Sequence, residues 1–307
     1  MPQVFECADT SHCALSEAIE ALAELDFDPT CEERLATAVQ WLRRLGNNRT
    51  FLADLLIDQL SGRRSANAGI DSAYGPQAIV LSPRCQGSTG GMFLRANIWP
   101  SEQDLCFRTS GARSFVYDVP HDHDFSFLTC GYLGPGYRSD YYEYDYDRVA
   151  GYAGEPVDLT FIERSALHEG KLMLYRRHLD IHRQVPPESL SVSLNVMHID
   201  PAQNWFDQYG FDLERQEVSR VLSPNASEAF LRVAVATGSD DALDFAEWVG
   251  SQHPSDRLRL ASFEARAGIC CDSDSRDAIW RDAEGGGSRL LATVAAKRRR
   301  MLAGIPS

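Results

Sequence analysis

Hydrophobic residues in the first sixty positions recur with the period of amphipathic helices. Thr30 and Glu33 have the spacing of a capping box, and Gly46 occupies the position of a C-cap glycine. The apolar stripes consist of Leu35, Val39 and Leu42 in one run and of Leu52, Leu55, Leu56 and Leu60 in the next. Helices this short cannot bury their own apolar faces. We therefore predict that residues 1–68 form a helical cover on another part of the protein.

From about Ala73 to Asp200 the pattern changes to short runs with the composition and turn spacing of β-strands. These runs are QAIVLS, MFLRANIWP, DLCFRTS, SFVYDVP, FSFLTCGYL, YRSDYYEYD, VDLTFIE, KLMLYR and LSVSLNVM. The sequence Gly134-Pro135-Gly136 is the clearest turn between them. Because the runs do not alternate with helices, we expect an antiparallel barrel or sandwich over residues 69–210 and not a parallel nucleotide-binding sheet.

After about residue 222 the pattern returns to helices of about ten to fifteen residues, each closed by glycine or a short polar loop. The predicted helices are FLRVAVATG, ALDFAEWVG, LRLASFEARAG, AIWRDAEGGG and LLATVAAKRRRMLAG. We assign residues 211–307 to a helical module that serves as a cap or in dimerisation. A peptide-binding solenoid is less favoured because five short helices offer little concave surface.

The charge of the chain argues against a nucleic-acid partner. Its 307 residues include 44 acidic and 30 basic side chains, for a net charge of −14, which repels a phosphate backbone. The dense basic cluster Lys297–Arg300 lies near the end of the last predicted helix, where cations interact favourably with the helix dipole. We therefore expect no nucleic-acid binding.

The N-terminal sequence has no basic segment followed by an apolar core, and no window approaches eighteen apolar residues. We therefore expect a cytoplasmic protein with no membrane partner. The eight cysteines form no C-x-x-C pair, a pattern that indicates reduced thiols and no disulfide framework. The adjacent Cys270 and Cys271 are expected to be loop thiols, with a redox pair as the alternative.

Two histidines, His121 and His123, begin the segment PHDHDFSFLTCGYLGPG. Alternate residues of a strand face the same way, so both imidazoles can reach one metal ion. An H-x-H pair alone is equally compatible with two surface or structural histidines. A metal site on a β-barrel needs a third ligand from a distant strand. The remaining histidines of the β-rich region are His168, His178, His182 and His198.

The segments PHDHDFSFLTCGYLGPG and GKLMLYRRHLDIHRQVPPESLSVSLNV resemble the two conserved motifs of the cupin superfamily. Gly134 has the position of the hairpin glycine in the first motif. Gly170 opens the second motif, and His182 lies one residue beyond the usual place of its histidine. The resemblance covers about residues 105–200 and is nearest to bacterial cupin-like proteins whose activity is generally unassigned. It implies an α+β protein with an antiparallel barrel, a double-stranded β-helix, between N-terminal helices and a C-terminal helical module.

The metal ligands that this resemblance implies depart from the family pattern. The family's metal-binding glutamate would occupy position 127 or 128, where this chain has Phe127 and Leu128. A three-histidine site similar to that of thiol dioxygenases is therefore implied, with the ligands His121, His123 and His182. His178 is the competing third ligand, and we choose His182 from its position in the motif.

We expect this site to hold one divalent metal ion. Neutral imidazoles can hold Fe(II) on one side and leave positions where substrate and dioxygen bind together, so Fe(II) is favoured. Zinc, manganese and nickel are the alternatives.

A hairpin centred on Pro135 would pair Phe127 with Glu143 and place Glu143 and Tyr141 on the histidine face. We predict Glu143 and Tyr141 as candidate catalytic residues, with Glu143 acting as a metal ligand or as a general acid or base. A register shift of one residue would turn Glu143 outward. The acidic run DYYEYDYD would then be a solvated edge strand.

The strand LSVSLNVM alternates between apolar and more polar positions. Its serine and asparagine face could line a ligand cavity, which makes Ser193 and Asn195 candidate substrate contacts, while its apolar face would pack against helices. Arg113 is a candidate clamp for a substrate carboxylate, and Arg138 and Arg176 are further candidates for that role. Any of these arginines could equally be a surface residue or a salt-bridge partner.

The favoured function is a metal-dependent oxygenase or oxidase that acts on a small polar metabolite with dioxygen as co-substrate. Dependence on 2-oxoglutarate is disfavoured, because enzymes of that class usually have a basic residue about ten positions after the distal histidine and residues 188–197 contain none. One alternative is a metal-dependent isomerase, lyase or hydrolase on the same barrel. Another is a non-catalytic ligand sensor or scaffold, and a homodimer is compatible with all three.

Overall fold

The computed structural model describes residues 2–61, 77–88, 90–238 and 240–304. The chain divides into two compact units. The first, here called the sheet unit, comprises residues 1–146, 158–203 and 210–216. The second, the helical unit, comprises residues 147–157, 204–209 and 217–307. The domain boundary predicted between residues 68 and 69 lies outside the described residues, and the division predicted between 210 and 211 stays a prediction.

Two antiparallel sheets form the sheet unit, as the sequence predicts for an α+β protein. The order in the larger sheet is β1 (Gln3–Phe5), β8 (Leu172–Tyr175), β5 (Phe127–Leu133), β10 (Ser191–Ile199), β4 (Gly91–Trp99) and β2 (Ala78–Val80), with β3 (Cys85–Gln86) also paired to β4. The order in the smaller sheet is β7 (Thr160–Ala166), β6 (Arg138–Glu143) and β9 (Asp180–Val185).

The described strands do not close into the single barrel that the family resemblance implies. No described strand of the larger sheet pairs with a strand of the smaller one, and between β5 and β6 the chain leaves the larger sheet and enters the smaller one. Gly134 and Gly136 have φ angles of 80° and 77°, which suit glycine, and the Gly136 N–H donates to Ser191 Oγ at 3.0 Å. Strands β5 and β6 therefore pair with other strands and not with each other.

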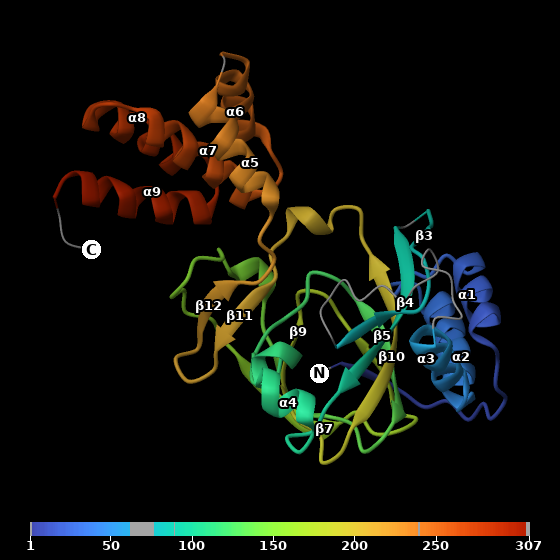
Figure 1. The fold of residues 1–307 in the computed structure, drawn as a ribbon. Coiled ribbons are helices and arrows are strands. Elements are labelled where there is room, and N and C mark those ends of the chain that lie inside the picture. Colours follow the sequence, from blue (N-terminus) through green and yellow to red (C-terminus); the bar gives the residue numbers. More distant parts are fainter. Residues whose placement is uncertain (1, 62–76, 89, 239, 305–307) are drawn as a thin grey trace. The chain divides into compact units, whose positions relative to one another are not determined.

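Three helices cover the outer face of the larger sheet, α1 (Leu15–Glu24), α2 (Glu32–Asn47) and α3 (Phe51–Leu60), as Figure 1 shows. One buried cluster joins Leu22, Leu42 and Leu45 of these helices to Leu128 of β5 and to Leu194 of β10. In this cluster the N-terminal helices pack on the sheet, and the apolar face of β10 packs against them. Apolar burial drives both contacts.

Two local predictions for these helices, the capping box at Thr30 and the C-cap at Gly46, are wrong. The Cys31 residue occupies the N-cap of α2, and Thr30 hydrogen-bonds to Asp28 instead of forming the predicted capping box. Gly46 lies inside α2 and not after it. A Cβ atom at Gly46 would lie 3.2 Å from Cys130 Sγ, so this glycine permits the close approach of α2 to β5.

Part of the predicted strand region is helical. The run DLCFRTS forms the short helix α4 (Leu105–Ser110), and a 3-10 turn follows at Ala112–Phe115. The Asp104 carboxylate accepts hydrogen bonds from the N–H and hydroxyl of Ser101, which turns the chain before the helix begins. Local side-chain bonds of this kind compete with strand formation. Two further 3-10 turns lie at Tyr146–Arg148 and Gln203–Trp205.

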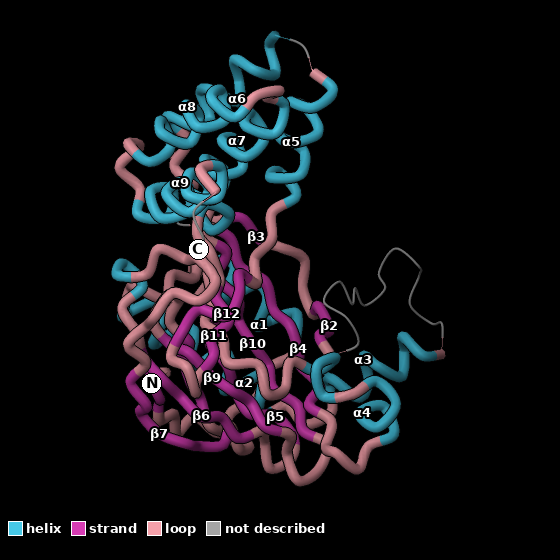
Figure 2. The backbone as a smooth tube through the Cα atoms, turned by 90° about the vertical axis from the view of Figure 1, so that its left-hand side faces the viewer, coloured by secondary structure: helices cyan, strands magenta, loops and turns pink. Residues whose placement is uncertain are grey.

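The helical unit contains the five helices that the sequence predicts. They are α5 (Ala226–Thr237), α6 (Asp240–Gln252), α7 (Asp256–Ile269), α8 (Ser273–Glu284) and α9 (Arg289–Leu302), which lie side by side in Figure 2. The side chains of Asn225, Ser255, Asp272 and Ser288 cap four of them. Strand β12 (Glu217–Val221) precedes them, and β11 (Tyr209–Asp212) lies where the chain passes between the two units.

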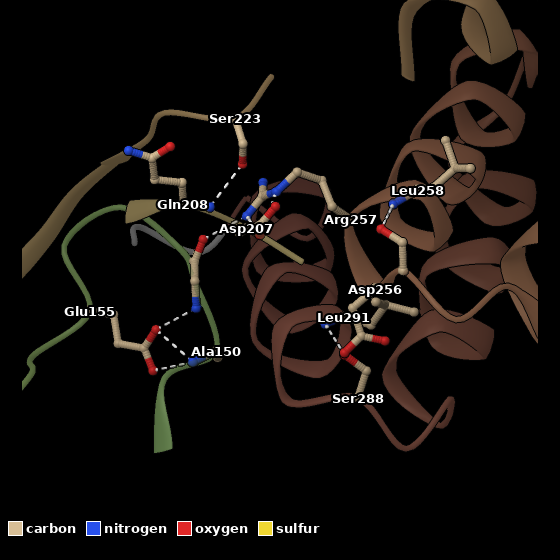
Figure 3. A network of polar contacts seen from close by, with 12 residues as sticks. Ala150, Glu155, Asp207, Gln208, Ser223, Asp256, Arg257, Leu258, Ser288 and Leu291 are labelled. Atoms are coloured by element: carbon tan, nitrogen blue, oxygen red, sulfur yellow. Dashed lines mark hydrogen bonds and ion pairs between the residues drawn. The ribbon is translucent and has the colours of Figure 1, made fainter. Parts of the chain in front are cut away.

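Polar contacts connect the loops of the helical unit to its helices (Figure 3). Arg257 of α7 bonds to the Asp207 carboxylate at 2.8 Å and to the Gly151 carbonyl at 2.9 Å. The buried Glu155 carboxylate accepts hydrogen bonds from the N–H groups of Ala150 and Gly151. Within the described part of the chain, no helix has the length and apolar composition needed to cross a membrane.

Candidate metal centre

His121, His123 and His182 come together in the sheet unit from two distant segments. His182 lies on β9, and the other two lie in the loop before β5. The backbone N–H of His121 donates to the His182 carbonyl at 3.1 Å, and the His182 N–H donates to the His121 carbonyl at 2.9 Å. This reciprocal bridge fixes the H-x-H loop beside β9. The resemblance therefore selected the histidines that the fold brings together.

The three imidazole rings face one another. Their centroids lie 4.9 Å apart for His121 and His123, 4.5 Å for His121 and His182, and 4.9 Å for His123 and His182. One nitrogen of each ring lies within 4.8 Å of the corresponding atom of the other two. Among the described residues this is the one group of three or more histidine, cysteine or carboxylate side chains close enough to hold a metal ion.

The hydrogen bond of the His121 ring fits metal ligation through its Nε2 atom. His121 Nδ1 lies 2.7 Å from the Val119 carbonyl oxygen, which can only accept, so Nδ1 carries the proton and Nε2 has a lone pair. That Nε2 lies 3.2 Å from His182 Nε2. Two nitrogens bound to one ion at about 2.0–2.1 Å, at tetrahedral or octahedral angles, lie roughly 2.9–3.4 Å apart. In the described structure, the buried Nδ1 atoms of His123 and His182 have no hydrogen-bond partner.

Burial keeps these histidines in the form that binds metal. The pKa of His123 and that of His182 lie well below the ordinary histidine value, because burial disfavours the charged ring and the neighbouring histidines add to this effect. Aromatic rings surround His123, with Phe125 at 4.9 Å and Phe127 at 5.0 Å between centroids. A neutral imidazole in a dry aromatic environment is a suitable ligand for a transition metal.

The position at which the cupin resemblance implied a glutamate is apolar in the structure. Phe127 packs on the His123 ring, and Leu128 faces the opposite side of β5, in the cluster with the N-terminal helices. His178, the competing third ligand, lies outside the group of three. Its φ angle is 59°, and its ring stacks on Tyr146 at 3.9 Å.

The predicted pairing of Glu143 with Phe127 is wrong, because β6 pairs with β7 and β9. The partners of Glu143 are Thr160 and Asp180. Its carboxylate accepts a hydrogen bond from Arg176 Nη2 at 2.8 Å, and Arg176 also binds the fully buried Asp180. Glu143 is not in the three-histidine group. A catalytic role for it stays a prediction, as does a substrate-clamping role for Arg176.

Tyr141 does lie on the histidine side of β6, directly opposite His182. Its hydroxyl is 2.9 Å from that of Tyr175, which is 3.2 Å from that of Tyr137. The Tyr175 ring lies 4.9 Å from His182. Burial raises the pKa of Tyr141 to about 12, so the hydroxyl remains protonated at neutral pH. Tyr137 and Tyr175 are not among the residues predicted from the sequence, because the first follows a turn and the second ends an apolar run.

The predicted substrate contacts lie in different surroundings. Ser193 is buried, and its Oγ accepts a hydrogen bond from Trp99 Nε1 at 3.0 Å. Asn195 is 2% exposed, and its Nδ2 has no partner in the described structure. Arg113 is exposed on a 3-10 turn, and the exposed Arg138 pairs with Glu188. Their roles in substrate binding stay predictions.

No protein-family model and no curated protein matches the chain. Among solved structures, it is similar to a DMSP lyase, with 10% identity over 67% of this chain and 82% of the other, and a TM-score of 0.23. It is also similar to a prolyl 4-hydroxylase from Phytophthora capsici, with 12% identity over 94% of this chain and 83% of the other, and a TM-score of 0.25. At such scores the case for a metal centre rests on the geometry of the histidines.

Proposed function

We propose that the sheet unit is a cupin-type, double-stranded β-helix domain in which His121, His123 and His182 hold one divalent metal ion, Fe(II) in the first place. The observation that carries this proposal is the convergence of three buried imidazoles with one nitrogen of each within 4.8 Å of the others. Three neutral nitrogen ligands leave coordination positions open, as a catalytic metal site requires.

The function we favour is a 2-oxoglutarate-independent oxygenase or oxidase that acts on a small polar metabolite. A bound ferrous ion would supply the redox chemistry with dioxygen. The protein supports that chemistry by excluding water, since Phe127 and Tyr175 stack at 4.5 Å beside the histidines. Strand β10 follows His182 in the sequence and would carry the basic group that binds 2-oxoglutarate. It contains no lysine or arginine.

A metal-dependent lyase or isomerase is the second candidate, and the three tyrosines favour it. The hydroxyls of Tyr137, Tyr175 and Tyr141 form a buried hydrogen-bonded series beside the His182 ring. Such a series can hold or move a proton within the site. Turnover without oxygen would favour this candidate, whereas oxygen consumption that depends on substrate would favour the oxygenase.

Metal analysis of histidine variants tests the metal centre. Protein purified without oxygen and loaded with Fe(II) or Zn(II) should bind about one equivalent. The variants His121→Ala, His123→Ala and His182→Ala should each lose most of it, because the two remaining imidazoles make a weak site. His178→Gln is the matched control and should keep its metal. Full metal content in all three alanine variants would disprove the assignment.

A further inference from the structure

A row of polar side chains crosses the larger sheet on the face that carries the aromatic cluster. Thr129 of β5 and Arg95 of β4 both lie directly opposite Asn195 of β10. Because side chains alternate along a strand, these three share a face with Phe127 and Met197, which belong to the buried aromatic cluster. The row therefore points to the same side of the sheet as the rings that pack on His123.

Two members of this row have buried polar atoms with no protein partner. Thr129 is fully buried and Asn195 is 2% exposed. The hydroxyl of Thr129 and the Nδ2 of Asn195 make no hydrogen bond in the described structure. Buried hydroxyl and amide groups almost always have partners, so a bound molecule or water is expected between them. Both groups can donate a hydrogen bond to an anion.

Arg95 adds a positive charge beside these donors. Its Cζ atom lies 5.8 Å from the centre of the Phe127 ring, and that ring lies 5.0 Å from the His123 ring. One aromatic side chain thus separates the guanidinium from a predicted metal ligand. Burial raises the pKa of Tyr137, and the nearby charge of Arg95 opposes part of that rise.

We propose that Arg95, Asn195 and Thr129 form an anion subsite that binds the carboxylate of a small substrate whose other end reaches the three-histidine centre. A planar guanidinium binds a carboxylate through two parallel hydrogen bonds, and the amide and hydroxyl complete its coordination. The subsite selects short carboxylic acids over neutral analogues. Its place in catalysis rests on the proposed function, but its affinity for carboxylates does not.

Fluorine NMR titration of the full-length, metal-free protein tests this subsite. Trifluoroacetate serves as the carboxylate probe, and trifluoroacetamide as its neutral isostere. Wild-type protein should bind trifluoroacetate at least tenfold more tightly than the amide. Arg95→Gln should weaken trifluoroacetate binding by tenfold or more, and Arg95→Lys should weaken it less. Asn195→Asp should abolish binding, because it places a negative charge in the subsite.

Controls separate this inference from the metal assignment. Arg108→Gln removes an exposed arginine of α4 and should bind trifluoroacetate as the wild type does. Arg95→Gln should bind as much Zn(II) as the wild type does. Equal affinity of wild type and Arg95→Gln for trifluoroacetate, equal affinity for acid and amide, or less zinc in Arg95→Gln than in the wild type would each overturn the proposal. Because the titration uses metal-free protein, its result can be interpreted even if the metal analysis of the histidine variants disproves the metal centre.

Discussion

At the scale of single residues, the hydroxyl of Tyr175 has a central place. It is fully buried and lies within hydrogen-bonding distance of both Tyr137 and Tyr141, and in the described structure no hydrogen bond joins those two tyrosines directly. Burial raises the pKa of Tyr175 well above its ordinary value. The series is therefore a neutral network whose stability depends on every member having a partner.

Removing the central hydroxyl should cost more than removing either end. Tyr175→Phe leaves two buried hydroxyls without this partner, whereas Tyr141→Phe and Tyr137→Phe each remove one hydrogen bond. Each buried polar group left unsatisfied costs about 1–3 kcal/mol. Urea denaturation should therefore rank Tyr175→Phe as the least stable of the three, with metal content unchanged in all. A Tyr175→Phe variant as stable as the other two would contradict the network.

The sequence identified the residues of the metal centre better than those around it. His121, His123 and His182 could be selected because motif spacing is local information. Glu143 was misplaced because its pairing depends on which strand lies next to β6, a choice that distant segments make. Arg95 was missed, although its charge interrupts the apolar run MFLRANIWP and was the available signal. Polar residues that interrupt an apolar strand in this way are candidates for lining a cavity.

At the scale of secondary-structure elements, the contact between α2 and β5 depends on a small residue. Gly46 faces the sheet, where a Cβ atom would lie 3.2 Å from the sulfur of Cys130. The alternation of β10 and the period of the N-terminal helices were predictable because each follows from one face being buried. The close approach at Gly46 was not, since a glycine near the end of a helix equally suggests a C-cap.

A bulky side chain at Gly46 should force α2 away from the sheet. Gly46→Leu is expected to lower the free energy of unfolding by about 1–3 kcal/mol, the usual cost of overpacking a core. Ala36→Leu is the matched control, because Ala36 is exposed on the same helix and can accept a larger side chain. Thermal or urea denaturation checks both variants. Equal stability of the two would show that α2 does not need this contact.

At the scale of the whole molecule, several histidines are held neutral by burial. The pKa of His178 is lowered to about 4, and those of His123, His182 and His198 are also lowered, with burial as the main cause in each case. In the unfolded chain all four have ordinary values near 6.5. Below that pH the unfolded state therefore binds more protons than the folded state.

The metal-free protein should consequently lose stability as the pH falls from 7.5 to 5.5, a window above the titration of most carboxylates. Above about 6.5 both states are neutral at these histidines, so their full contribution is present there and declines in acid. Each histidine contributes a slope of up to about 1.4 kcal/mol per pH unit. His198→Gln should flatten the curve by one such contribution.

Added Zn(II) should raise the stability of the protein at pH 7.5 and lose this effect in acid, because protons compete with zinc for the same histidine nitrogens. Urea denaturation in EDTA and in zinc measures both curves, and a flat curve in EDTA would show that these histidines are not buried neutral in solution.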